Sequence, residues 1–199
     1  MKNTHRRVIV LSTLITVLTL TSALLLALAP APLSPDSTSS LFAIDTPQTM
    51  DVVFQTDTPA RTARWKYIYI HHSRTTSGNA TSLARTPEGA ADHFVIGNGD
   101  GCADGEIQIS QRWNKQLSAA PPAGARDIDP DCISICVVGD FDRSVPTPTQ
   151  VRRLGQLVST LQGRLHVSGR GVLLIEQPGS VAGIGKFFPT TAFREQLLP

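Results

Sequence analysis

The sequence predicts a mixed α/β domain, with a central β-sheet flanked by helices and an N-terminal membrane helix ahead of it. Three segments carry the prediction of the sheet and its helices. Residues 66–71 alternate in the manner of a strand, and residues 133–139 are nearly all apolar, as in a central strand covered on both faces. Residues 148–165 have the apolar spacing of an amphipathic helix. Strands interspersed with one long helix indicate a mixed sheet on which helices pack.

The membrane prediction depends on residues 8–29, which carry no charge and follow Lys2, Arg6 and Arg7. As a helix this segment is about 33 Å long, enough to cross the ~30 Å hydrocarbon core, with the positive flank in the cytoplasm. The alternative is a cleaved signal peptide with a site at Ala27-Leu28-Ala29. The first reading predicts a single-pass inner-membrane protein whose domain faces the periplasm, and the second a secreted protein.

Composition divides the chain into three parts. Residues 1–30 are the anchor or signal peptide, and residues 31–63 are rich in Pro, Ser, Thr and Asp, which is typical of an extended linker. Within that linker we expect residues 50–54 to form a short strand that docks on the domain. The folded domain is predicted over residues 64–199.

Charge argues against nucleic acid as a partner. The chain has 18 Lys and Arg and 16 Asp and Glu, but three of the basic residues precede residue 8. The remainder has 15 basic and 16 acidic residues and is therefore close to neutral. It contains no basic run of the kind that binds phosphate backbones.

The domain's elements follow in order along the chain. A first strand is predicted over residues 66–71 and a second over 92–97, closed by the turn signal Asn98-Gly99-Asp100-Gly101. Residues 106–110 alternate polar and apolar, and residues 172–175 form a final buried strand.

The long helix has the clearest start signal. Thr147 is the expected N-cap, Pro148 takes the first helical position and Gln150 completes a capping box. The apolar face then comprises Val151, Leu154, Leu157, Val158, Leu161 and Leu165.

Three cysteines, Cys102, Cys132 and Cys136, allow one disulfide in an oxidising compartment. Cys132 and Cys136 are about 13 Å apart on an extended strand and cannot bond each other. If a disulfide forms, Cys102 and Cys132 are the favoured pair; the alternative is three buried thiols that behave as small hydrophobes.

The first strand ends in a histidine pair. Tyr67, Tyr69 and His71 share one face, and His72 lies on the other. An imidazole at the end of a sheet strand is well placed to hold a metal over a cleft.

Four motifs in a fixed order reveal a resemblance: YIYIHHS at 67–73, HFVI at 93–96, ICVVGDF at 135–141 and PTPTQ at 146–150. Together they resemble the type 2 N-acetylmuramoyl-L-alanine amidase family, which includes the peptidoglycan recognition proteins and phage lysozyme-amidases. The resemblance covers residues 64–190 and implies the family's mixed sheet with flanking helices.

The resemblance implies a zinc amidase that cleaves between muramic acid and the first alanine of the stem peptide. The family holds zinc with two histidines and a cysteine or aspartate, leaving a position for water. His71 matches the first ligand, but Ile175 and Gly183 occupy the other two positions. Asp92 stands at the family's tyrosine and Val181 at its lysine. Ile and Gly offer no lone pair, so no bound cofactor is expected and no catalytic residue is assigned.

Two groups of residues leave alternatives open. His71 with Asp92 could form a rebuilt zinc site, with Glu106 or Glu176 as a third ligand, or His71 could simply form local hydrogen bonds. Candidates for contact with substrate are Tyr69, His93 and Trp113, the alternative for each being a structural or packing role.

The sequence therefore favours an amidase-fold domain with a degraded zinc site that binds peptidoglycan or a muropeptide without cleaving it. The second hypothesis is a working zinc amidase with relocated ligands. The third is a structural ectodomain that scaffolds other proteins. Residues 8–29 would supply the contact with the membrane.

Overall fold

The computed structural model describes residues 47–86, 89–120, 129, 131–175 and 183–197, together with residues 14, 16–19 and 21. The described residues from 47 onward belong to one compact unit. Among all described residues, none of the helices is both long and apolar enough to cross a membrane. The predicted membrane segment 8–29 lies mostly outside the described residues and stays a prediction.

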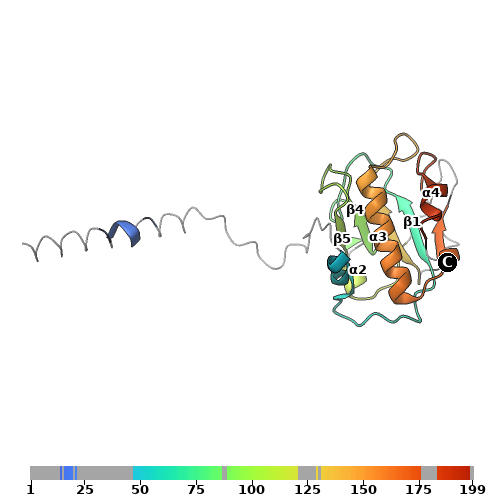
Figure 1. Ribbon diagram of the computed structural model, residues 1–199, viewed down its shortest axis with the longest axis horizontal. Coiled ribbons are helices and arrows are strands. Elements are labelled where there is room, and N and C mark those ends of the chain that lie inside the picture. The colour runs from blue at the N-terminus through green and yellow to red at the C-terminus, as the bar shows by residue number, and fades with distance from the viewer. Residues whose placement is uncertain are drawn as a thin grey trace, which may run out of the picture. The chain divides into compact units, whose positions relative to one another are not determined.

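A five-stranded mixed sheet forms the centre of the domain, as the sequence predicted (Figure 1). Its middle strand pairs in parallel with both neighbours, and only one edge strand runs antiparallel. Each strand predicted between residues 64 and 199 is present, with ends that differ from the prediction by at most two residues. The strand order is β5 (Ile107–Ile109), β4 (Phe94–Ile96), β6 (Ile133–Val137), β1 (Ile68–His72) and β7 (Val172–Leu174).

The long helix α3 (Pro148–Leu165) crosses one face of this sheet (Figure 1). It begins with the predicted capping box: Thr147 accepts from the amide of Gln150, and the Gln150 side chain accepts from the amide of Thr147. Its apolar side packs against the alternate strand residues that face it, which confirms the predicted amphipathic helix. The buried core on this face includes Ile68, Ile70, Phe94, Ile135, Leu154, Leu157, Val158 and Leu161.

The segment expected as a docking strand is the 3₁₀-helix η1 (Pro47–Phe54), so that prediction is wrong in element type. A 3₁₀-helix has three residues per turn, which places Met50 and Val53 on the same side. Both are buried in the core beside Trp113, whose indole Nε1 donates to the Val53 carbonyl. The segment docks as predicted, but through one helical side.

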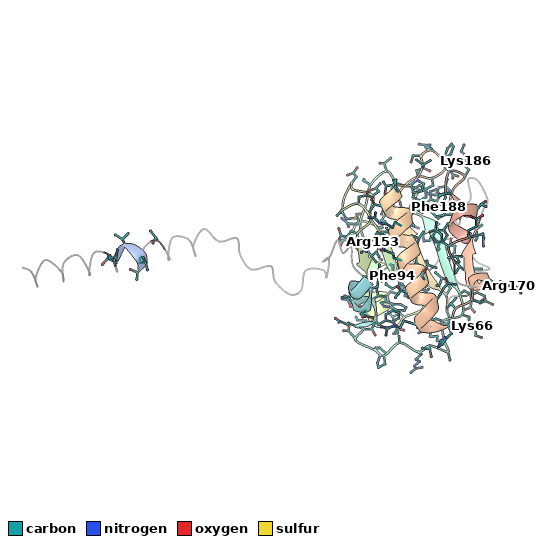
Figure 2. All side chains as sticks on the ribbon, in the orientation of Figure 1. Lys66, Phe94, Arg153, Arg170, Lys186 and Phe188 are labelled. Carbon is teal, nitrogen blue, oxygen red and sulfur yellow. The ribbon has the colours of Figure 1, made fainter. Side chains whose placement is uncertain are left out.

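The sequence did not predict the shorter elements around the sheet. Figure 2 labels Arg153 on α3. Its Nε donates to the Gly105 carbonyl at 3.3 Å and so holds the connection between β4 and β5 against the helix. The shorter elements that the sequence did not predict are the strand pair β2 (Ala84–Thr86) and β3 (Gly89–Ala90), α2 (Gln111–Asn114), η2 (Gly169–Gly171) and α4 (Thr190–Arg194).

Of the two alternatives for the cysteines, the structure shows free thiols: Cys102, Cys132 and Cys136 form no disulfide. Cys132 directly precedes β6, whereas Cys102 follows the end of β4. Since β4 and β6 run parallel, the two thiols lie towards opposite ends of the sheet. Cys102 instead donates to the Gly78 carbonyl, with a sulfur–oxygen distance of 3.2 Å.

Candidate functional site

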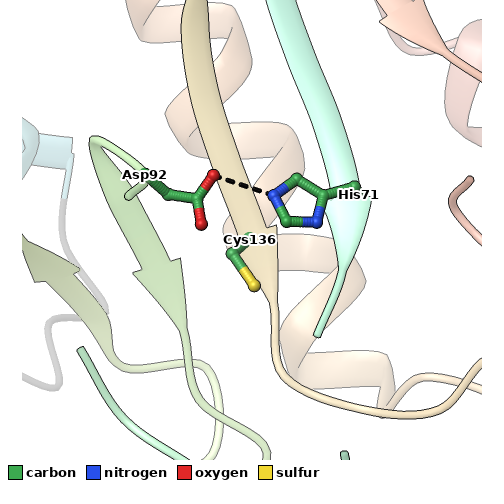
Figure 3. A group of neighbouring side chains, drawn as sticks. All are labelled: His71, Asp92 and Cys136. Carbon is green, nitrogen blue, oxygen red and sulfur yellow. Dashed lines mark hydrogen bonds and ion pairs between the residues drawn. The ribbon is translucent and has the colours of Figure 1, made fainter. Parts of the chain in front are cut away.

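A buried polar cluster lies on the sheet face opposite α3 (Figure 3). His71 is on β1 and stands directly across the parallel ladder from Cys136 on β6. Asp92 comes two residues before β4, the other neighbour of β6. His71 and Cys136 therefore lie at one level of the sheet, and the Asp92 carboxylate reaches the His71 imidazole from the segment that precedes β4.

His71 makes hydrogen bonds through both ring nitrogens. Its Nε2 lies 2.8 Å from Oδ1 of Asp92, and its Nδ1 lies 3.1 Å from the backbone carbonyl of His72. A carbonyl and a carboxylate are acceptors, so this arrangement suits an imidazolium that donates from both nitrogens. The Ser134 hydroxyl donates to the same oxygen of Asp92 and helps fix the carboxylate.

Electrostatics favour the charged form of both partners. Burial alone would lower the pKa of His71, but the charge of Asp92 and its hydrogen bond raise that pKa above its ordinary value. Burial would raise the pKa of Asp92, but the His71 charge and the hydrogen bonds from His71 and Ser134 lower it. Both pKa directions therefore favour an ion pair between the two side chains.

The neighbouring acids are neutral. Burial, reinforced by the Asp92 charge, raises the pKa of Tyr69 and that of the Cys136 thiol. The Tyr69 ring stacks on the His71 ring, with centroids 5.1 Å apart. Since a thiolate is the nucleophilic form of cysteine, the protonated Cys136 is poorly suited to attack a substrate.

The two remaining family ligand positions also lie beside the end of β1. The Gly183 carbonyl is 3.4 Å from the His72 amide, and the Ile175 carbonyl accepts from the Ile184 amide at 3.0 Å. The Ile175 side chain packs against the apolar cluster around Tyr69.

The family's zinc does not fit these three positions. Ile175 is a hydrocarbon and Gly183 has no side chain, so His71 is the one donor among them. A catalytic zinc site uses three protein ligands, and one imidazole cannot replace that set.

The structure brings together His71 and Asp92, the two residues considered for a rebuilt metal site. Of the suggested third ligands, Glu106 instead accepts from the Ala103 amide at 2.9 Å, and Glu176 lies outside the described residues. The third donor is Cys136, which sequence reasoning missed. The pairing of two parallel strands was the only signal that could have revealed it.

The proposed substrate contacts lie in the interior. Tyr69, His93 and Trp113 each have no measurable exposure, and Trp113 packs in the α3-side core. His93 Nδ1 accepts from the Ser134 amide at 3.0 Å, and its Nε2 donates to the Leu117 carbonyl at 2.8 Å. All three have structural roles, and direct contact with substrate stays a prediction.

His72 lies on the α3 side of β1 and differs from His71. Its Nδ1 accepts from the Phe141 amide at 2.9 Å, and its ring stacks on Phe141. Burial lowers the pKa of His72, so it is a neutral core residue. This agrees with the face predicted from strand alternation.

The sheet, the covering helix and the strand-end histidine agree with the fold class that the sequence resemblance implied. A family model described as N-acetylmuramoyl-L-alanine amidase matches residues 61–179, more than half of the chain. The chain therefore belongs to the N-acetylmuramoyl-L-alanine amidase family. No curated protein matches the chain significantly.

Several solved structures are similar to this chain, and three of them illustrate the likeness. The amidase LysC from Clostridium intestinale URNW has 17% identity and a TM-score of 0.48, covering 71% of this chain and 91% of its own. The endolysin amidase LysCS from the same organism has 18% identity and a TM-score of 0.43, covering 71% and 89%. PGRP-Hd from Alvinella pompejana has 17% identity and a TM-score of 0.41, covering 68% and 85%.

Proposed function

We propose that this domain binds the peptide portion of peptidoglycan and does not cleave it. Family membership supports peptidoglycan as the ligand class. The observation that carries the absence of cleavage is the position of Ile175 and Gly183. Both lie beside the end of β1, where the family ligands are expected, yet neither side chain can coordinate a metal.

The state of His71 supports the same proposal. Both ring nitrogens are engaged, and the residue is only 2% exposed. A metal at the family position would have to draw one nitrogen out of a buried ion pair without help from two other ligands. Losing an outer-sphere partner already costs about 10–100-fold in metal affinity or activity, and losing direct ligands costs more.

The test combines binding and cleavage. The purified full chain is incubated with peptidoglycan sacculi, and with soluble muropeptides in added Zn²⁺. We expect the chain to sediment with the sacculi and to release no free stem peptide. Stem-peptide release above a no-protein blank would show that the domain is an amidase, and failure to sediment would contradict peptidoglycan binding.

A restored-ligand variant makes the negative result informative. Ile175→His with Gly183→Cys returns the donor types that the family resemblance implies. We expect this double variant to gain zinc and some amide cleavage, whereas the single variants remain inactive. Activity in the wild type equal to that of the double variant would remove the basis of the proposal.

A second candidate function is amide hydrolysis with relocated ligands, favoured by the clustering of His71, Asp92 and Cys136. It predicts stem-peptide release by the wild type that disappears in His71→Ala. The cleavage assay above separates the two candidates.

For either function we place the domain outside the cytoplasmic membrane, where peptidoglycan lies. Residues 8–29 would anchor the chain or direct its secretion. Fractionation of cells that produce the full chain tests this placement: recovery in the cytoplasmic fraction would contradict it.

A further inference from the structure

We propose that His71, Asp92 and Cys136 bind one divalent transition metal of the zinc class, at a site distinct from the family's own ligand set. Each residue offers one donor atom, and the three atoms lie within 4.8 Å of one another. Figure 3 shows the imidazole and the carboxylate facing each other, with Cys136 beside them on β6.

The set of donors selects the class of metal. Zinc accepts nitrogen, sulfur and oxygen ligands, whereas calcium and magnesium prefer oxygen alone. Zinc bonds of about 2.0–2.3 Å in a tetrahedron place neighbouring ligand atoms roughly 3.5 Å apart. The most separated donors here need to approach by about 1 Å, which side-chain rotation can supply. The His71–Asp92 contact, now 2.8 Å, would open slightly as the metal replaces the shared proton.

The surroundings already support two of the donors. A metal-binding histidine commonly donates its other N–H to a carbonyl or carboxylate, and a ligating carboxylate is itself hydrogen-bonded. Here Nδ1 of His71 lies 3.1 Å from the His72 carbonyl, which leaves Nε2 for the metal. The Ser134 hydroxyl donates to Asp92. Both arrangements are present without any change of the backbone.

This site lies on the β6 side of His71, whereas Ile175 and Gly183 adjoin β1 from the β7 side. The two possible sites therefore share one residue and differ in every other ligand. A metal in the cluster would link β1 and β6 to the segment before β4 that carries Asp92, and these three segments are distant in sequence.

Burial points to a structural role for this metal. His71 and Cys136 are each 2% exposed and Asp92 is 8% exposed. A metal enclosed to this degree stabilises the folded state, because the unfolded chain does not hold its ligands together. The proposal does not depend on peptidoglycan binding.

The experiment uses the full chain, stripped with a chelator and titrated with Zn²⁺ and, separately, Co²⁺. We expect one metal per chain by elemental analysis and, with Co²⁺, the near-ultraviolet charge-transfer band of a cobalt–thiolate bond. The band reports sulfur coordination in the wild type itself, so the test does not require a variant to fold. A folded wild type that binds no metal, or that binds cobalt without this band, overturns the proposal.

Variants then identify the ligands. Cys136→Ser and Asp92→Asn should each weaken Zn²⁺ binding by at least about 10-fold, given that even outer-sphere losses cost that much. Cys132→Ser is the matched control, since Cys132 is also buried and adjoins the same strand but lies outside the cluster. It should retain full stoichiometry and the cobalt band. Equal loss in Cys132→Ser and Cys136→Ser, or no loss in Cys136→Ser, would overturn the assignment.

The sedimentation assay, repeated with metal-free and metal-loaded chain, keeps the two proposals separable. Loss of sacculus binding with normal metal stoichiometry contradicts the proposed function alone. Absence of metal with normal sacculus binding contradicts the metal site alone.

Discussion

The face of the sheet under α3 and the face opposite it differ in composition: both contain apolar clusters, but only the second also contains the His71–Asp92 pair. Under α3, strand residues such as Ile70, Phe94 and Ile135 pack against helix residues such as Leu157. On the opposite face, an ion pair and a hydroxyl occupy the equivalent level of the sheet. The hydrophobic effect is non-directional, whereas hydrogen bonds fix donor and acceptor positions. We therefore expect the face under α3 to supply most of the stability, and the hydrogen bonds on the opposite face to fix the positions of His71 and Asp92.

The largest effect should come from a cavity under α3. Leu157 is fully buried, so Leu157→Ala should lower the free energy of unfolding by about 3–4 kcal/mol, within the usual range for such truncations. Urea unfolding of the full chain measures this. The folded fraction should still bind sacculi and metal like the wild type.

Val145→Ala is the control for this truncation, because Val145 is 71% exposed. It should change stability by less than about 0.5 kcal/mol. Equal destabilisation by both variants would contradict the claim that the α3 face supplies most of the stability. Loss of metal binding by folded Leu157→Ala would contradict the claim that the opposite face alone positions the metal ligands.

The next largest effect is the pH dependence of stability, in which the two buried histidines His93 and His71 act in opposite directions. Burial lowers the pKa of His93 to about 4, so its neutral form is favoured in the folded state. Its contribution to stability is present above the ordinary histidine pKa of 6.5 and is lost as pH falls towards 4. At roughly 1.4 kcal/mol per pH unit, the loss approaches about 2–3 kcal/mol. His71 has the opposite effect because its pKa is raised in the folded state. Its contribution to the free energy of unfolding is present below pH 6.5 and is lost as the pH rises through the pKa of the folded state.

Urea unfolding at pH 7 and pH 4.5 measures the contribution of His93 to stability. The difference in stability between wild type and His93→Gln should shrink on acidification, because the variant has no imidazole to protonate at that position. A difference independent of pH would contradict the assignment of His93 as a neutral, buried base.

Local signals explain why the α3 face was predictable from sequence. The capping box at Thr147 and the helical spacing that follows lie within one continuous segment. The apolar run of β6 likewise indicates a covered strand by itself. Each of these features is set by residues within a few positions, so sequence reasoning recovered them.

The cluster of His71, Asp92 and Cys136, by contrast, forms only through the order and register of the strands, and no local sequence signal determines these. His71 meets Cys136 only because β1 pairs with β6 in a particular register. Asp92 was recognised through its family position, and Cys136 was interpreted as a small buried hydrophobe. The error at η1 has a local origin: a short apolar run such as residues 50–54 fits a strand or a helix equally well.

The smallest predicted effect concerns the hydroxyl that orients Asp92. Ser134→Ala should cost about 1–2 kcal/mol, since a hydrogen bond to a charged acceptor contributes about 1.5–3 kcal/mol and Asp92 retains its contact with His71. It should also raise the pKa of Asp92, because one of the hydrogen bonds that lowers it is removed. A double-mutant cycle of Ser134→Ala with Asp92→Asn isolates the interaction from other effects of each change. A coupling energy below about 0.5 kcal/mol would mean that the hydroxyl does not orient the carboxylate, and the polar face would then depend on the ion pair alone.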